Sequence, residues 1–227
     1  MIKTRVEQRW KSPDVADHYD SERFESLLGR LYHRLQCSAL RRCLRHVPGG
    51  SRIVDVPCGT GRMLPLLVCY ASSVIGMDVS DAMMKHARRR LNGQGRVCFV
   101  RGDAKAMPLA DRSVDAVFCI RFAMHLKPAE RSAVLQEFAR VSRNHVVVEF
   151  GCDSRWHRVR RLWRSLFFKV LRPRHTYPKS VSKQDIVAGA RGAGLEVCGW
   201  QWTQRVASES VFVHMRKQEV PARSVGD

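Results

Sequence analysis

The sequence of 227 residues contains no apolar run of about 18 residues, the length that a membrane-spanning helix needs. It also lacks an apolar signal core, because Ile2–Arg5 lead directly into polar sequence. Acidic side chains are scarce as well: 21 Asp and Glu stand against 40 Lys and Arg, for a formal net charge of +19. The first two absences predict a cytoplasmic protein, and the third favours polyanionic partners such as nucleic acid or anionic lipid.

The eight cysteines contain no Cys-x-x-Cys pair, which argues against a zinc site, and no metal site is predicted. Several cysteines lie in apolar runs, so we expect buried free thiols in a reducing compartment rather than disulfides. Lysine is scarce too, since only 9 of the 40 basic residues are Lys. A GC-rich coding sequence also produces such an excess of Arg on solvated faces, so charge alone does not identify a partner.

Strand-like and helix-like segments alternate after the break at Pro48–Gly50, which predicts a parallel sheet covered on both faces. We expect one domain over 1–217, with a helical lead-in at 1–47, a basic insertion at 151–181 and a flexible tail at 218–227. The expected strands are Arg52–Val56, Ser73–Met77, Val97–Val100, Val114–Ile120 and His145–Phe150, followed by an antiparallel hairpin of Leu195–Trp202 and Ser210–Met215 at a sheet edge. The expected helices are 14–46, 61–70, 81–91, Pro128–Arg140 and 183–192.

The strongest local signal is residues 53–61, Ile-Val-Asp-Val-Pro-Cys-Gly-Thr-Gly, in which an acid ends a strand before a glycine turn. Gly59 and Gly61 permit positive φ and let a ligand approach the backbone closely. Leu64 stands where a dinucleotide-binding fingerprint needs its third glycine, and no Gly-Lys-Ser/Thr sequence follows. The turn therefore predicts a ligand site at the carboxyl end of a strand. It is neither a dinucleotide-binding fingerprint nor a phosphate-binding P-loop.

Further acids follow the next strands in order. Asp78 ends the second strand, where a carboxylate can accept both hydroxyls of a ribose. It is not needed to cap the next helix, because Ser80 or Asp81 supplies that cap. Asp103 follows the third strand and can accept from the exocyclic amine of adenine, and Asp115 opens the fourth strand.

Over about residues 50–150 these segments resemble the class I S-adenosylmethionine (SAM)-dependent methyltransferases. The resemblance implies an α/β, Rossmann-like fold with a seven-stranded, mostly parallel sheet, an antiparallel last strand, helices on both faces, the helical lead-in and a helical lid insertion. It also implies SAM across the strand tips, with Tyr19 closing over it. The cofactor-binding residues so predicted are Tyr19, Asp55, Pro57, Cys58, Gly59, Gly61, Asp78, Met83, Asp103, Ala104 and Arg121. The layout is similar to that of ubiquinone and menaquinone methyltransferases.

One departure from the family pattern concerns the glycine turn itself. Pro57 replaces the first glycine of the usual Asp-x-Gly-x-Gly-x-Gly pattern. Proline fixes φ near −65° and removes an N–H donor, so cofactor binding requires that this position take an ordinary φ. A non-catalytic SAM-binding partner module therefore stays open as an alternative to an enzyme.

The chemistry of methyl transfer needs mainly alignment of the reactants. A general base is required only if the acceptor loses a proton, and His125, just after the fourth strand, is the first candidate; a structural role for it is the alternative. His18 is a second candidate near the acceptor. Arg121 could hold a carboxylate or phosphate of the acceptor, or pair with a nearby Asp. No Asn/Asp-Pro-Pro-Tyr/Phe motif follows the fourth strand, which weakens nucleic-acid amino methylation without excluding RNA.

The insertion is basic and amphipathic: residues 154–179 contain nine Lys and Arg and no acid. Trp163 and other apolar side chains share one helical face, which is typical of an interfacial helix. Three interpretations stay open: a lid over the acceptor with Trp163 touching it, a lid whose 154–172 also contacts the inner face of the membrane, or an RNA-binding helix. We expect methyl transfer to oxygen or carbon of a small or lipid-linked acceptor, with an RNA methyltransferase as alternative; the sequence does not predict an oligomeric state.

Overall fold

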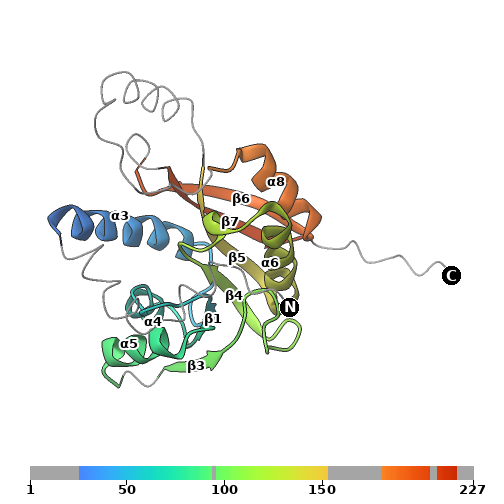
Figure 1. Ribbon diagram of the computed structural model, residues 1–227. Coiled ribbons are helices and arrows are strands. Elements are labelled where there is room, and N and C mark those ends of the chain that lie inside the picture. The colour runs from blue at the N-terminus through green and yellow to red at the C-terminus, as the bar shows by residue number, and fades with distance from the viewer. Residues whose placement is uncertain (1–25, 94–95, 153–179, 205–208, 219–227) are drawn as a thin grey trace.

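The computed structural model describes residues 26–93, 96–152, 180–204 and 209–218 (Figure 1). These residues form a seven-stranded sheet in the order β3-β2-β1-β4-β5-β7-β6. The strands are β1 (Arg52–Asp55), β2 (Ser73–Asp78), β3 (Val97–Arg101), β4 (Val114–Cys119), β5 (Ser142–Gly151), β6 (Leu195–Trp202) and β7 (Ser210–Lys217). Strands β1 to β5 are parallel, and β7 is antiparallel to both β5 and β6. The predicted fold class and the antiparallel hairpin are confirmed.

Helices cover both faces of the sheet. They are α3 (Leu27–Leu44), α4 (Leu64–Val68), α5 (Asp81–Leu91), α6 (Pro128–Val141) and α8 (Lys183–Gly192). Helices α3, α4 and α5 lie on one face, and α6 and α8 lie on the other (Figure 1). Alternation along each strand produces this division, because Ile53 packs toward α3 and α4 whereas its neighbour Val54 packs toward α6.

Serine caps explain where three of the helices begin. The hydroxyl oxygens of Ser26, Ser80 and Ser182 accept from backbone N–H groups at the starts of α3, α5 and α8. Pro128 occupies the first turn of α6, where its missing N–H has no helical partner to lose. Of the two caps predicted for α5, Ser80 and Asp81, the structure shows Ser80.

The boundaries of two predicted helices were wrong. The helix expected at 61–70 is only Leu64–Val68, because Gly61 keeps φ at +75° and residues 61–63 belong to the preceding turn. The helix expected at 14–46 is Leu27–Leu44 among the described residues, and the rest of the lead-in, residues 1–25, lies outside them. The basic insertion at 153–179 and the tail at 219–227 also lie outside the described residues.

The cysteines are free, as predicted, but their burial differs from the expectation. Cys43, Cys58, Cys119 and Cys152 are buried and Cys37 is intermediate. The other three, Cys69, Cys98 and Cys198, are exposed, so the prediction of buried thiols was wrong for them. Each of these three lies at the end of a short helix or on an outer strand of the sheet, where one side faces solvent.

No helix within the described ranges is long and apolar enough to cross a bilayer. The core instead consists of two apolar clusters, one on each face of the sheet. The strand order reverses between β1 and β4, so the carboxyl ends of these two central strands face a crevice. This switch point is where open α/β sheets bind their ligands.

Candidate functional site

The glycine turn after β1 packs closely on its neighbours. Its positive φ values fall on Gly59 (+53°) and Gly61 (+75°), so Pro57 occupies a position that does not require a glycine conformation; the Val56–Pro57 peptide bond is cis. A Cβ at Gly61 would lie 2.7 Å from the Cβ of Ala87 in α5. Nothing lies within 4 Å of a Cβ built at Gly59. Gly61 is therefore required for packing, whereas Gly59 leaves open space.

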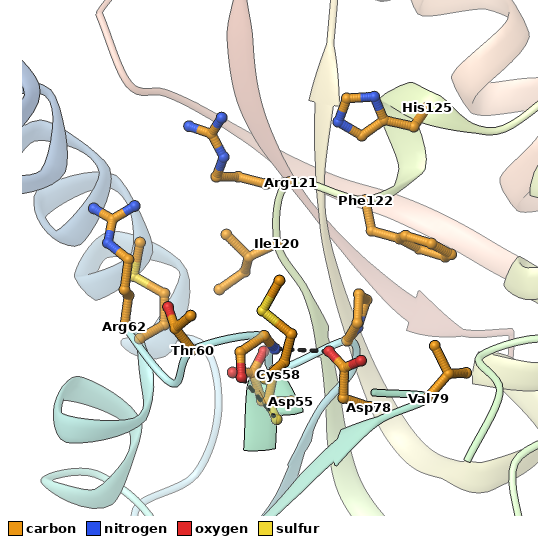
Figure 2. A pocket seen from close by; sticks show the side chains of 14 residues that line it. Asp55, Cys58, Thr60, Arg62, Asp78, Val79, Ile120, Arg121, Phe122 and His125 are labelled. Carbon is orange, nitrogen blue, oxygen red and sulfur yellow. Dashed lines mark hydrogen bonds between the residues drawn. The ribbon is translucent and has the colours of Figure 1, made fainter. Parts of the chain in front are cut away.

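Asp78 holds the turn in place from the end of β2. Its Oδ2 accepts from the backbone N–H of Gly59 at 2.9 Å (Figure 2). Its Oδ1 accepts from the N–H of Ser80, also at 2.9 Å. The side chain is buried, which raises its pKa, although these backbone N–H groups oppose the shift. A carboxylate has about four lone-pair sites, so both oxygens can still accept from a ligand.

Asp55 lies at the end of β1 beside Asp78. It is 2% exposed, and its Oδ1 has no hydrogen-bond partner. Burial, and then the charge of Asp78, raise the pKa of Asp55 to about 8. A buried carboxyl oxygen without a partner costs free energy in the protein alone. It is therefore suited to a ligand that brings a donor or a positive charge.

The third side of the site follows β4. Arg121 has φ of +59°, a left-handed conformation that few residues other than glycine adopt. Its N–H donates to Oε2 of Glu149 at 3.1 Å. Glu149 is fully buried in β5, and its Oε1 accepts from Nε2 of Gln36 in α3 at 2.8 Å and from the hydroxyl of Ser210 in β7. Three elements thus fix the backbone at Arg121 through one carboxylate.

These groups line a cavity of about 150 Å³. Its carboxylates lie at the floor in Figure 2, and Arg121 and His125 lie at the opposite end. Arg62 lies at one side, with its guanidinium group pointing away from the floor. Apolar side chains fill much of the wall between them, as expected for a small-molecule site. The lining residues are Asp55, Pro57, Cys58, Gly59, Thr60, Arg62, Met63, Asp78, Val79, Met83, Ile120, Arg121, Phe122 and His125.

The structure brings together most of the predicted site residues, but not all. Those that line the cavity are Asp55, Pro57, Cys58, Gly59, Asp78, Met83, Arg121 and His125. Gly61 faces α5, and Asp103 and Ala104 also lie outside the lining; Oδ1 of Asp103 accepts from the N–H of Lys105 at 2.9 Å. The cofactor contacts assigned to these three stay predictions, as do those assigned to the residues that line the cavity. The predicted residues His18, Tyr19 and Trp163 lie outside the described residues.

Sequence reasoning missed six lining residues: Thr60, Arg62, Met63, Val79, Ile120 and Phe122. Five of them neighbour a predicted residue in the chain, and Met63 lies two residues after Gly61, so adjacency was the available signal. It also missed Glu149, a lone acid in the apolar run Val-Val-Val-Glu-Phe, which the sequence already marks as a buried charge. Within the described ranges no group of three or more His, Cys, Asp or Glu could hold a metal ion.

Comparison with known proteins identifies the class to which this fold and site belong. The methyltransferase domain family matches residues 53–145, a segment that contains most of β1, the glycine turn, Asp78 and β4. The resemblance to the class I SAM-dependent methyltransferases that the motifs predicted is confirmed over this segment.

Individual relatives agree with this class. Methyltransferase GfsG of Streptomyces halstedii is 32% identical over 138 residues, covering 59% of this chain and 45% of that protein. The demethylmenaquinone methyltransferase of Clavibacter sepedonicus is 38% identical over 104 residues, covering 46% and 41%. The chain thus spans about half the length of the curated relatives that it matches.

Solved structures show the same fold. The magnesium protoporphyrin IX methyltransferase from Synechocystis, solved with bound SAH, superposes with a TM-score of 0.73. The match covers 94% of this chain and 98% of that one at 16% identity, so it concerns the fold alone.

Proposed function

We propose that this chain is a SAM-dependent methyltransferase that acts on a small-molecule acceptor in the cavity at the carboxyl ends of β1, β2 and β4. The observation that carries the proposal is the arrangement around Asp78, whose carboxylate accepts from Gly59 and lies beside the buried, partnerless Oδ1 of Asp55. The family match over residues 53–145 supports the same conclusion.

The residues present fit SAM. The buried Oδ1 of Asp55 would accept from the cofactor's ammonium group, and Asp78 would accept from its ribose hydroxyls. The open space at Gly59 lets the ligand approach the backbone. SAM is a cation at its sulfur, and two raised-pKa carboxyl groups at the floor of the cavity would be stabilised in their charged form by such a ligand.

When bound, SAM supplies a methyl group that is already activated for transfer. The protein's contribution is then to align the two reactants, which can supply several kcal/mol of the barrier. Met83, Ile120 and Phe122 line the cavity and exclude water from the reacting atoms. His125 lines the end opposite to the carboxylates, where it can take a proton from an acceptor that must lose one.

We further propose that the acceptor is methylated at an oxygen or a carbon atom. Relatives named for the methylation of demethylmenaquinone and of malonyl-acyl carrier protein support small or carrier-linked acceptors. Contact of residues 154–172 with a membrane surface belongs to this proposal as well, although that segment lies outside the described residues. The net charge of +19 supports RNA methylation as a second candidate.

The first experiment separates cofactor binding from turnover. Isothermal titration should show that SAM binds the wild-type protein and that Asp78→Ala weakens this binding. Methyl-tritiated SAM is then supplied with extract fractionated into lipid, small polar molecules, RNA and protein. Label in the lipid or small-molecule fraction supports the proposal, and label confined to RNA replaces it with the second candidate. SAM binding with no label in any fraction would instead favour a non-catalytic SAM-binding module.

A further inference from the structure

Two guanidinium groups line the cavity, and they come from different elements. Arg62 lies in the glycine turn after β1, and Arg121 follows β4. Figure 2 shows both guanidinium groups on the same side of the cavity, away from the floor that Asp55 and Asp78 form. The cavity therefore has an acidic end, suited to a cation, and a basic end, suited to anions.

The backbone at Arg121 is unusual for a side chain of this size. A residue other than glycine at φ of +59° is strained, and such strain persists only where the surroundings hold it in place. Here the Arg121 N–H donates to Glu149, a buried carboxylate tied to α3 and β7 through Gln36 and Ser210. Glycine would take this conformation without strain, so a long cationic side chain is held at the strand tip against the backbone preference.

The charges of the cofactor distinguish the two arginines. SAM brings one carboxylate of its own, on the same amino-acid portion whose ammonium group would meet Asp55. Arg62 belongs to the turn that begins at Asp55, so it is suited to the cofactor's carboxylate. Arg121 lies beside Ile120 and Phe122, on the wall that the acceptor would face, and the cofactor offers no second anion for it.

We infer that Arg121 binds an anionic group of the acceptor, a carboxylate or a phosphate, so that the substrates of this protein are acids with an apolar portion. The planar guanidinium matches either group with two parallel N–H···O bonds. The neighbouring Ile120 and Phe122 contact the apolar portion. This inference rests on the proposed function and adds the chemical class of the acceptor to it.

The test uses the full chain and small-molecule extract freed of protein and nucleic acid. The extract is passed over an anion exchanger before the reaction, and the retained and unretained fractions are each supplied with methyl-tritiated SAM. The retained fraction alone should accept label. Pretreating it with phosphatase then separates the two sources, since loss of label identifies a phosphate and persistence identifies a carboxylate.

Variants assign the effect to Arg121. Asn tolerates positive φ, so Arg121→Asn removes the guanidinium without adding backbone strain. It should lower kcat/KM for the retained fraction by about 30- to 100-fold, the range expected on losing a charge-assisted, bidentate contact. Its Kd for SAM should stay within about twofold of wild type, because the inference assigns Arg121 to the acceptor and not to the cofactor contact that the family resemblance implied. Arg121→Lys keeps the positive charge but cannot form two parallel hydrogen bonds. Its kcat/KM should therefore lie between those of wild type and Arg121→Asn.

Two further variants serve as counterparts. Arg62→Gln should raise the Kd for SAM, the quantity that Arg121→Asn should leave nearly unchanged. Arg45→Gln removes an exposed arginine that does not line the cavity, and it should change neither quantity. Melting curves confirm that each variant is folded.

Three outcomes would overturn the inference while leaving the methyltransferase proposal intact. They are label only in the unretained fraction, label only in RNA from whole extract, and unchanged kcat/KM in Arg121→Asn. A wild-type protein that binds SAM but labels neither fraction nor whole extract would instead overturn the proposed function, and the inference with it.

Discussion

The acids at the two ends of the sheet have opposite surroundings. At the carboxyl ends of β1 and β2, Asp55 and Asp78 are buried next to one another, and the pKa of each is raised. At the amino end of β4, Asp115 accepts from the N–H of Arg52 at 2.7 Å and from Nη1 of Arg143 at 2.8 Å. Partial burial opposes these contacts, but they hold the pKa of Asp115 below its ordinary value.

A second acid away from the cavity repeats the pattern. Glu137 in α6 accepts from Nε and Nη2 of Arg140, and this guanidinium lowers the pKa of Glu137. These two acids outside the site each have a guanidinium partner inside the protein, whereas the neighbour of Asp55 is a second acid, Asp78, whose charge helps to raise the pKa of Asp55. Two neighbouring carboxyl groups with raised pKa values are expected where a cationic cofactor binds.

The largest expected effect is on cofactor affinity. Asp78→Asn should weaken SAM binding by about 100-fold, because it removes a charged acceptor for the ribose hydroxyls and for the Gly59 N–H. Asp115→Asn is the matched control at the other end, and it should leave the Kd for SAM unchanged while lowering the melting temperature. Titration calorimetry with both variants measures this, and equal effects would contradict the contrast between the two ends.

The glycines offer the next largest effect. Gly61→Ala places a methyl group 2.7 Å from Ala87 in addition to its unfavourable φ, so it should destabilise the fold by about 2–3 kcal/mol. Gly50→Ala, in the turn before β1, has φ of +77° but nothing within 4 Å, and it should cost only about 1 kcal/mol. Urea unfolding of the two variants separates close packing from conformation; equal losses would mean that packing at Gly61 is unimportant.

The pH dependence of Asp55 should be visible without ligand. Its pKa is about 8 in the folded protein, above its ordinary value, so the folded state retains the proton that the unfolded state loses. The free energy of unfolding should therefore decrease as pH rises from about 4 to about 8. Asp55→Asn should reduce this slope, to which the raised pKa of Asp78 also contributes, and should stabilise the ligand-free protein at pH 9 by about 1–2 kcal/mol. Identical pH profiles for wild type and variant would contradict the assignment.

The smallest expected effect comes from histidines away from the cavity. Nδ1 of His145 and Nε2 of His214 lie 3.0 Å apart, and the ring of His46 stacks on His214. Burial, followed by the charges of His145, His46 and Arg216, lowers the pKa of His214 to about 4. The unfolded chain thus binds protons first as pH falls, so stability should drop by about 1 kcal/mol between pH 6.5 and 4.

The control for this effect is His214→Gln, which keeps polar atoms but does not titrate. Urea unfolding at several pH values should show a flatter profile below pH 6.5 for this variant than for wild type. A steeper profile would mean that another group is responsible for the acid sensitivity.

The sequence predicts the layers of the fold well because they depend on local patterns. β-branched runs such as Ile53–Val54 mark buried strands, and Ser80 marks the start of α5. The acids at the tips of β1 and β2 were predictable for the same reason, since a charge that ends an apolar run must meet a partner or a ligand.

The remainder of the site depends on dihedral angles and on distant contacts. Nothing local predicts that Arg121 takes φ of +59°, because the conformation is held by Glu149, which follows 28 residues later. Nor does the sequence show that Gly61 faces α5 while Thr60 and Arg62 face the cavity, since this follows from the φ of the turn. A positive φ in the turn changes the direction of the chain, and with it the directions in which the adjacent side chains point.

The position of β7 has a consequence for the order in which the protein can be completed. β7 follows β6 in the chain but lies between β5 and β6 in the sheet, so β6 has no neighbour until Ser210–Lys217 have been synthesised. The same strand carries Ser210, whose hydroxyl bonds to Glu149 behind Arg121. A ribosome-bound chain that ends before Ser210 would therefore expose one edge of β5 and lack support for its cavity. Premature termination there would remove binding competence together with this edge of the sheet, although the described residues that line the cavity would all be present.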